Sequence, residues 1–182
     1  RSLGITVNGC FSTPTGQAML FVPDEERDRT AILVDMGYLT TEVMAVEGDA
    51  LTFLKVLPMG GGHIAADLAY GLEITLSAAE QIKRAYVYGL SAGQASFEGV
   101  NKEGESKTFS REEVEKVLEP RAEEICEAVR DAIKESGVKL SNWSPIYLTG
   151  GGLAINRGGR DFLAAKLEKP VRELPRKAVK LS

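Results

Sequence analysis

Apolar residues occur along this chain in short runs whose spacing changes from the period of strands to that of helices. The continuous apolar run Ala31–Val34 ends in Asp35-Met36-Gly37, which is typical of a strand covered on both faces. The runs 41–46 and 51–57 flank the turn residues Glu47-Gly48-Asp49 and predict an antiparallel hairpin. We therefore expect three sequential strands in the first third of the chain. Before them, the pattern predicts a short strand at 5–7 and a short helix at 15–22.

The middle of the chain follows the helical period. Ser77 with Glu80, and Ser110 with Glu113, have the spacing of capping boxes and mark two helix starts. The second of these helices is expected to be the longest and to end at Ser136-Gly137. The polar stretch 99–107 predicts a small exposed hairpin. The helices expected from periodicity are 63–70, 77–89, 110–136 and one that carries Phe162, Leu163 and Leu167.

Two more strands are expected near the end, at 146–149 and 171–174. The order of strands and helices indicates an α/β protein with a mixed five-stranded sheet flanked by helices and a small inserted α+β part. With 182 residues and 43% hydrophobic content, the chain can bury one core with a modest insertion. It begins with Arg1 and reaches patterned sequence almost at once, so we expect it to be a piece of a longer protein.

Composition excludes several classes of function. The chain has 26 acidic and 22 basic residues and a formal net charge of -4, which gives no electrostatic footprint for nucleic acid. No apolar stretch approaches the roughly 20 residues of a membrane span, so we expect no direct membrane insertion by this chain. Two cysteines are too few for a disulfide scaffold and fit a reducing cytoplasm. The lone His63, just after three glycines, is expected at a helix start rather than in a metal site.

Three short motifs could carry chemistry. In the first, a strand ends at Asp35 and a tight turn follows, with Gly37, Thr40 and Thr41. Such a turn can direct backbone amides at phosphate oxygens, while the carboxylate can hold a metal ion through water. Taken alone, Asp-x-Gly is also a common way to begin a hairpin.

The second motif is Gly150-Gly151-Gly152, where a strand ends before a predicted helix. Glycines allow a sugar or a flat ring to approach the main chain, and a helix start supplies free amides. The third is Glu80, Lys83 and Arg84, which share one helical face and could hold ribose and adenine. The plain alternative for the triple glycine is a flexible turn between strand and helix. The plain alternative for the third motif is a solvent-exposed helix face with a local ion pair.

Taken in order along one chain, the three motifs resemble the second lobe of the actin-like ATPase superfamily, and most closely the bacterial cell-division FtsA family. Asp35-Met36-Gly37 with Thr40-Thr41-Glu42 resembles the second phosphate loop of that superfamily. Residues 79–83 resemble its nucleoside-facing helix, and residues 148–152 resemble its adenosine loop. The resemblance covers residues 18–174.

The resemblance implies a ribonuclease H-like, actin-type lobe. Its core subdomain would comprise residues 1–61 and 137–182, and the smaller inserted subdomain residues 62–136. ATP and Mg²⁺ are the implied cofactors, with Asp35 near the metal. The resemblance implies Gly37, Thr40 and Thr41 at the phosphates, Glu80 and Lys83 at ribose, Gly150, Gly151 and Gly152 beside ribose and adenine, and Arg84 against adenine.

The resemblance also implies partners. They are an N-terminal lobe outside this chain that completes the cleft, further copies in a filament, and a tubulin-like division protein. The expected location is the cytoplasm, peripheral to the inner face of the membrane through parts outside this chain. ATP hydrolysis would be weak in the parent protein and is not expected from this chain alone.

Tyr38 and Leu39 depart from the family pattern, which has glycine or another small residue at these positions. They motivate an alternative hypothesis, a degenerate actin-like scaffold that no longer binds nucleotide, for example a platform for pilus assembly. A third hypothesis is the lobe of a small-metabolite kinase from the same superfamily.

Overall fold

A computed structural model of the chain describes residues 4, 6, 9–10, 12–89 and 95–174. Residues 5 and 7 of the strand predicted at 5–7 lie outside the described residues. The elements are α1 (Thr13–Phe21), the 3-10 helix η1 (Asp24–Glu26), β1 (Ala31–Met36), β2 (Thr41–Glu47), β3 (Ala50–Leu57), α2 (Gly61–Gly71), α3 (Leu76–Ala85), β4 (Ser96–Val100), β5 (Ser106–Ser110), α4 (Arg111–Glu135), β6 (Ile146–Thr149), α5 (Gly159–Leu167) and β7 (Val171–Arg172).

The main sheet has five strands in the order β3-β2-β1-β6-β7. β1, β2 and β3 pair antiparallel, whereas β6 runs parallel to β1 and β7 runs parallel to β6. The predicted mixed five-stranded α/β sheet is therefore confirmed. The last strand is shorter than expected and ends at Arg172.

Alternating residues of β1 enter two different cores, which explains why this strand is apolar throughout. Ile32 and Val34 belong to a large cluster shared with the helices α2, α4 and α5. Leu33 points to the opposite face and packs with Ala18 and Val22, contributed by α1 and its end. A strand buried on both faces is fixed in its register, because a slip of one residue would exchange the two faces. The carboxyl end of β1 is thereby held in place.

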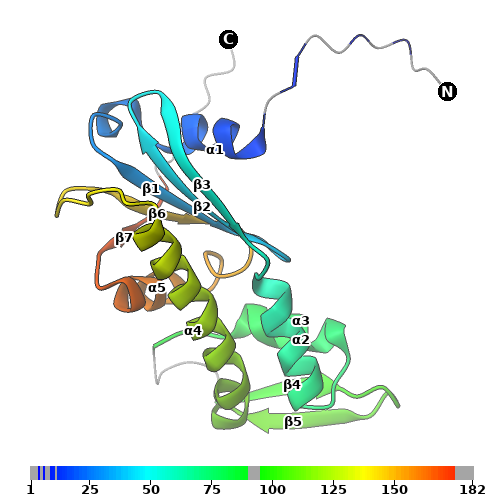
Figure 1. Cartoon of the computed structure of the whole chain (residues 1–182). Helices are drawn as coiled ribbons and strands as arrows, with labels where there is room; N and C mark the ends of the chain where they lie inside the picture. The colour runs from blue at the N-terminus through cyan, green and yellow to red at the C-terminus, as the bar shows by residue number, and fades with distance from the viewer. Residues whose placement is uncertain (1–3, 5, 7–8, 11, 90–94, 175–182) are drawn as a thin grey trace, which may run out of the picture.

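The elements α2, α3 and the β4-β5 hairpin lie together at one end of the molecule, and α4 runs from that hairpin to the sheet (Figure 1). The hairpin predicted around 99–107 is confirmed, with Phe97 and Phe109 facing each other and buried. The large apolar cluster includes both rings and also β1, so packing is continuous between the two ends. The division into 1–61 with 137–182, and 62–136, stays a prediction. None of the helices in the described ranges is long and apolar enough to cross a membrane.

The start of α3 differs from the prediction. The helix α3 begins two residues earlier than the Ser77–Glu80 spacing indicated, because the side chain of Thr75 accepts a hydrogen bond from the Ala78 amide. The predicted capping box is therefore wrong, and Glu80 is free to pair along the helix. The capping box of Ser110 and Glu113 at the start of α4 is confirmed.

This correction gives a stability prediction. Replacing Thr75 with alanine removes the acceptor of the Ala78 amide and should lower the free energy of unfolding by about 1 kcal/mol. Ser77 is exposed and is not the cap. Ser77→Ala should therefore change that energy by less than about 0.5 kcal/mol. Urea denaturation of both variants measures the difference, and an equal loss in the two would contradict the assignment of the cap.

Candidate functional site

The turn after β1 is held from the side of α2. The carbonyl oxygens of Gly37 and Tyr38 accept hydrogen bonds from the amides of Gly61 (2.9 Å) and Gly62 (2.7 Å). The Gly37 amide closes the turn onto the Thr40 carbonyl at 2.9 Å. Three bonds therefore fix a backbone segment that has no regular structure of its own.

This arrangement leaves backbone amides of the turn available. In a trans peptide the C=O and N–H bonds point in opposite directions, and the described chain contains no cis peptide. The N–H groups of Tyr38 and Leu39 therefore point away from α2. Within the described residues, no hydrogen bond engages the N–H of Tyr38, Leu39 or Thr40. Successive free amides in one turn are a binding site for anions such as phosphate.

A polar cluster adjoins this turn at the end of β1. The half-buried Asp35 accepts a hydrogen bond from Gln17 Nε2 at 2.5 Å and lies opposite Glu42 across the β1–β2 pair. Burial, and then the charge of Asp35, raise the pKa of Glu42. Two neighbouring carboxylates are the kind of oxygen ligands that bind Mg²⁺ directly or through water. Gln17 was not predicted, because its contact joins residues far apart in sequence.

The triple glycine lies against the same turn. Gly150 adopts φ +89°, and a Cβ atom there would lie 2.3 Å from the Met36 carbonyl oxygen and 2.4 Å from Asp35 Oδ1. The Gly152 amide donates to the Met36 carbonyl at 2.7 Å. Glycine is thus required where this loop contacts the end of β1. The expected helix does not follow directly, since α5 begins at Gly159, so a helix start directly after the glycines is a wrong prediction.

The third motif lies on α3. It is connected to the other two motifs by α2, which contacts all three. The side chain of Lys83 is 1% exposed, and its Nζ lies 3.0 Å from the Gly61 carbonyl oxygen and 2.8 Å from Glu80 Oε2. A Cβ on Gly61 would lie 2.6 Å from Gly152 Cα and 3.0 Å from Lys83 Nζ. Lys83, α2 and the glycine loop are therefore in direct contact.

Glu80 holds both basic residues of its helical face. It pairs with the buried Lys83 and, at 2.9 Å, with the exposed Arg84. Burial alone would raise the pKa of Glu80, but the hydrogen bonds and charges of Lys83 and Arg84 outweigh burial and lower it. The carboxylate is therefore charged at neutral pH.

The structure brings the predicted residues into one region but gives them different surroundings. The Thr40 side chain is exposed, whereas Thr41 is fully buried and donates to the Met59 carbonyl at 2.8 Å. Gly37 shapes the turn, and Gly151 is exposed between its two buried or half-buried neighbours. The roles of these residues in binding stay predictions.

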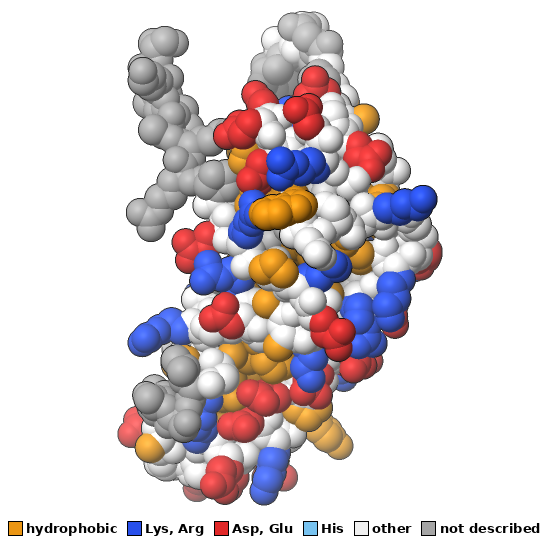
Figure 2. All heavy atoms as spheres, turned by 90° about the vertical axis from the view of Figure 1, so that its left-hand side faces the viewer, with side chains coloured by type: hydrophobic (Ala, Val, Ile, Leu, Met, Phe, Trp, Pro, Cys, Tyr) orange, Lys and Arg blue, Asp and Glu red, His pale blue; other side chains and the backbone are white. Residues whose placement is uncertain are grey.

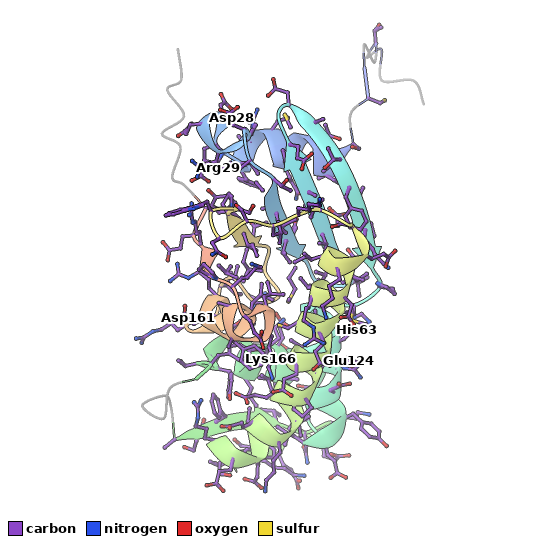
Figure 3. The ribbon with its side chains drawn as sticks, turned by 60° about the vertical axis from the view of Figure 1, so that its left-hand side comes forward. Asp28, Arg29, His63, Glu124, Asp161 and Lys166 are labelled. Atoms are coloured by element: carbon purple, nitrogen blue, oxygen red, sulfur yellow. The ribbon has the colours of Figure 1, made fainter. Side chains whose placement is uncertain are left out.

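A hollow of about 620 Å³ borders the glycine loop. Its wall includes Gly150, Ile155, Arg157 and Asp161, and Figure 3 shows Asp161 on the outer side of α5. The face that carries α5 and β7 shows lysine, arginine and acidic side chains interspersed (Figure 2). A hollow of this size, beside glycines and mixed polar groups, can accommodate a small organic ligand.

Asn156 connects the wall of this hollow to α3. It is buried, and its Nδ2 donates to the carbonyls of Lys83 (2.7 Å) and Tyr86 (2.9 Å), which satisfies the end of that helix. Its Oδ1 has no hydrogen-bond partner among the described residues. Neither Asn156 nor Gln17 belongs to a motif, so the sequence offered no signal for them.

His63 has a structural role, as predicted. Its Nδ1 accepts a hydrogen bond from the Gly60 amide at 3.1 Å and so caps the start of α2. Within the part of the chain that the structure describes, no group of three or more His, Cys, Asp or Glu side chains could hold a metal ion by itself. A cation at Asp35 would therefore need further ligands from water or from a bound phosphate.

A family model described as cell division protein FtsA matches residues 32–176. The chain belongs to the FtsA family. It is 30% identical over 158 residues to FtsA of Porphyromonas gingivalis, and covers 33% of that protein with 85% of its own length. It is 27% identical to FtsA of Agrobacterium fabrum over 154 residues, which are 81% of the chain and 35% of that protein.

The chain therefore spans about a third of the length of the FtsA relatives it matches. Solved structures show the actin-like fold. MreB5 of Spiroplasma citri bound to AMPPNP has a TM-score of 0.70 and 16% identity, with 88% of this chain and 53% of that chain covered. A PilM–PilN type IV pilus biogenesis complex has a TM-score of 0.65 and 22% identity, with 88% and 40% covered. The predicted family and fold are thus confirmed.

Proposed function

We propose that this chain is the C-terminal lobe of an FtsA-family protein that binds ATP in a cleft shared with an N-terminal lobe outside the chain. One observation carries the proposal: the free amides of Tyr38, Leu39 and Thr40, the carboxylate of Asp35 and the loop 150–152 all meet at the carboxyl ends of β1 and β6. Ligands of open α/β sheets bind at such strand ends. The FtsA family and the AMPPNP-bound MreB relative support a nucleotide as the ligand.

In the proposed complex, each part of the ligand has its own partners. The amides of Tyr38, Leu39 and Thr40 would bind phosphate oxygens, and Asp35 with Gln17 would orient a hydrated Mg²⁺. The ribose would lie near Glu80 and Lys83, and the adenine in the hollow beside Gly150. Bound Mg²⁺ would neutralise phosphate charge. Bulky side chains at 38 and 39 do not remove these donors, because the turn binds through its backbone.

The biological role proposed for the whole protein is that of its family. It would act in bacterial cell division, on the cytoplasmic side of the membrane, to which parts outside this chain would attach it. Copies would stack into filaments, as in the MamK double helical filament that the chain resembles in fold, and would contact a tubulin-like division protein. ATP hydrolysis would be weak and would need the N-terminal lobe.

The main competing function is a scaffold that has lost nucleotide. Its supporting observation is the Tyr38 ring, which lies over Gly62 and beside Lys83 within the site. The likeness in fold to the PilM–PilN complex is compatible with such a platform. The kinase hypothesis has no specific observation in its favour among the described residues.

Calorimetry with Mg-ATP on the full-length protein distinguishes the two. Asp35→Asn should weaken Mg-ATP binding about tenfold or more, since a charge-assisted contact to a hydrated cation contributes roughly 1.5 to 3 kcal/mol. Chelating the magnesium should weaken binding of the wild type and have little further effect on the variant. Asp28→Asn is the matched control, because Asp28 is exposed and lies at the far end of the sheet (Figure 3).

Absence of Mg-ATP binding in the folded wild-type protein would favour the scaffold. Equal binding by the wild type and Asp35→Asn would place the nucleotide elsewhere.

A further inference from the structure

Tyr38 takes up an unusual position for a residue of a phosphate-binding turn. Tyr38 is 49% exposed, and its ring lies against Gly62 at the start of α2. A Cβ on Gly62 would come within 2.7 to 2.9 Å of three ring carbons, so only glycine admits this contact. The ring is therefore folded back onto α2, on the side of the turn opposite to the free amides.

The same ring contacts the buried cation of the site. Lys83 Nζ lies 5.6 Å from the centroid of the Tyr38 ring, which is the distance of a cation–π contact. Lys83 is 1% exposed, and its other neighbours are Gly61 and Glu80. A half-exposed ring against a buried ammonium group forms part of the wall that separates that group from water.

The two sides of the site are therefore in different states. The phosphate side is open, because the amides of Tyr38, Leu39 and Thr40 have no partners among the described residues. The ribose side is covered, because Lys83 is bonded to Gly61 and Glu80 and is overlaid by Tyr38. A ribose that used Lys83 would have to displace the ring first.

We propose that Tyr38 is a specificity-determining residue whose ring covers Lys83 and must swing away before a nucleoside can reach that side chain. This inference rests on the proposed nucleotide function of the same site. Tyr38 then lowers the affinity for ligands that carry a nucleoside and leaves the affinity for a bare phosphate chain unchanged. When only a fraction of the protein molecules is in the state that can bind the ligand, the apparent affinity is lower by that fraction.

The first test needs no nucleotide. The ligand-free full-length protein is treated with an amine-reactive ester, and the modification rate of Lys83 is followed by mass spectrometry. Tyr38→Ala should accelerate modification of Lys83 roughly threefold to thirtyfold, the range expected for loss of a cation–π contact. Tyr38→Phe keeps the ring and should retain the protection. Tyr70→Ala is the control, because Tyr70 is 89% exposed on α2.

The second test compares two ligands by calorimetry, Mg-ADP and magnesium pyrophosphate. Tyr38→Ala should bind Mg-ADP more tightly by a similar factor, about threefold to thirtyfold, with pyrophosphate affinity unchanged. Thermal denaturation confirms that the variants are folded.

The results of these two tests distinguish a failure of the proposed Tyr38 role from a failure of the proposed nucleotide binding. Unchanged modification of Lys83 in Tyr38→Ala overturns the inference whatever nucleotide does. Equal or weaker binding of Mg-ADP by Tyr38→Ala also overturns it, since the ring would then be neutral or would stack on the nucleoside. Faster modification of Lys83 without binding of either ligand by any variant overturns the proposed nucleotide function and, with it, the specificity role.

Discussion

Replacing Gly150 with alanine is expected to destabilise the protein more than any other single change in the glycine loop. The residue adopts φ +89°, and an added Cβ would lie 2.3 Å from the carbonyl oxygen of Met36. That oxygen belongs to β1, which is buried on both faces and cannot move aside. Backbone strain and overlap together should lower the free energy of unfolding by about 3 kcal/mol or more.

The neighbouring glycine supplies a matched control. Gly151 is exposed, its φ is not in the left-handed region, and a Cβ there would meet nothing within 4 Å. Gly151→Ala should therefore change the unfolding free energy by less than about 0.5 kcal/mol. Urea denaturation followed by circular dichroism suits this comparison, because the single tryptophan, Trp143, is 70% exposed and reports poorly on the core. Equal stability of the two variants would contradict the close approach of the loop to β1.

Loss of Lys83 should have the second largest effect. Lys83→Met keeps the length of the side chain but leaves the Gly61 carbonyl oxygen without its donor and Glu80 without its buried partner. Removing one member of a buried pair costs about 3 to 5 kcal/mol, and we expect about 2 to 3 kcal/mol here because Glu80 is still paired with Arg84. Denaturation in urea measures the loss.

Arg84→Met is the control on the same helix. Arg84 pairs with the same carboxylate, but its side chain is 65% exposed. An exposed pair at this spacing contributes only about 0.3 to 0.5 kcal/mol. If the two variants were destabilised equally, Lys83 would not be the buried link between α2 and α3. Added salt should reduce the small effect of Arg84→Met and leave that of Lys83→Met almost unchanged.

The local pattern of apolar and capping residues was sufficient to predict most strands and helices of the fold. The apolar run at 31–34 predicted a strand covered on both faces, and the structure places Ile32 and Leu33 in two separate cores. The Ser110 cap and the long helix after it were also readable, because both depend on neighbours along the chain. Ser77 misled because Thr75, only two residues away, is an equally good cap.

The details of the site depended on contacts that sequence patterns do not encode. Gln17 reaches Asp35 from α1, and Asn156 reaches α3 from the loop after β6. The convergence of the three motifs was predicted from their order along the chain, and the contacts of Gly61 with Gly152 and Lys83 supply the geometry. The position of Tyr38 over Gly62 could not be foreseen, because a side chain in that turn has several rotamers open to it.

One bound nucleotide is expected to touch the turn 37–40, the face of α3 and the loop 150–152 at once. A crystal structure of the full-length protein with Mg²⁺ and ADP would show these contacts. We expect phosphate oxygens within hydrogen-bonding distance of the amides of Tyr38 and Leu39, and the Tyr38 ring turned off Lys83. Nucleotide bound away from Asp35, or a Tyr38 ring still lying on Gly62 with ribose elsewhere, would rule out this mode of binding.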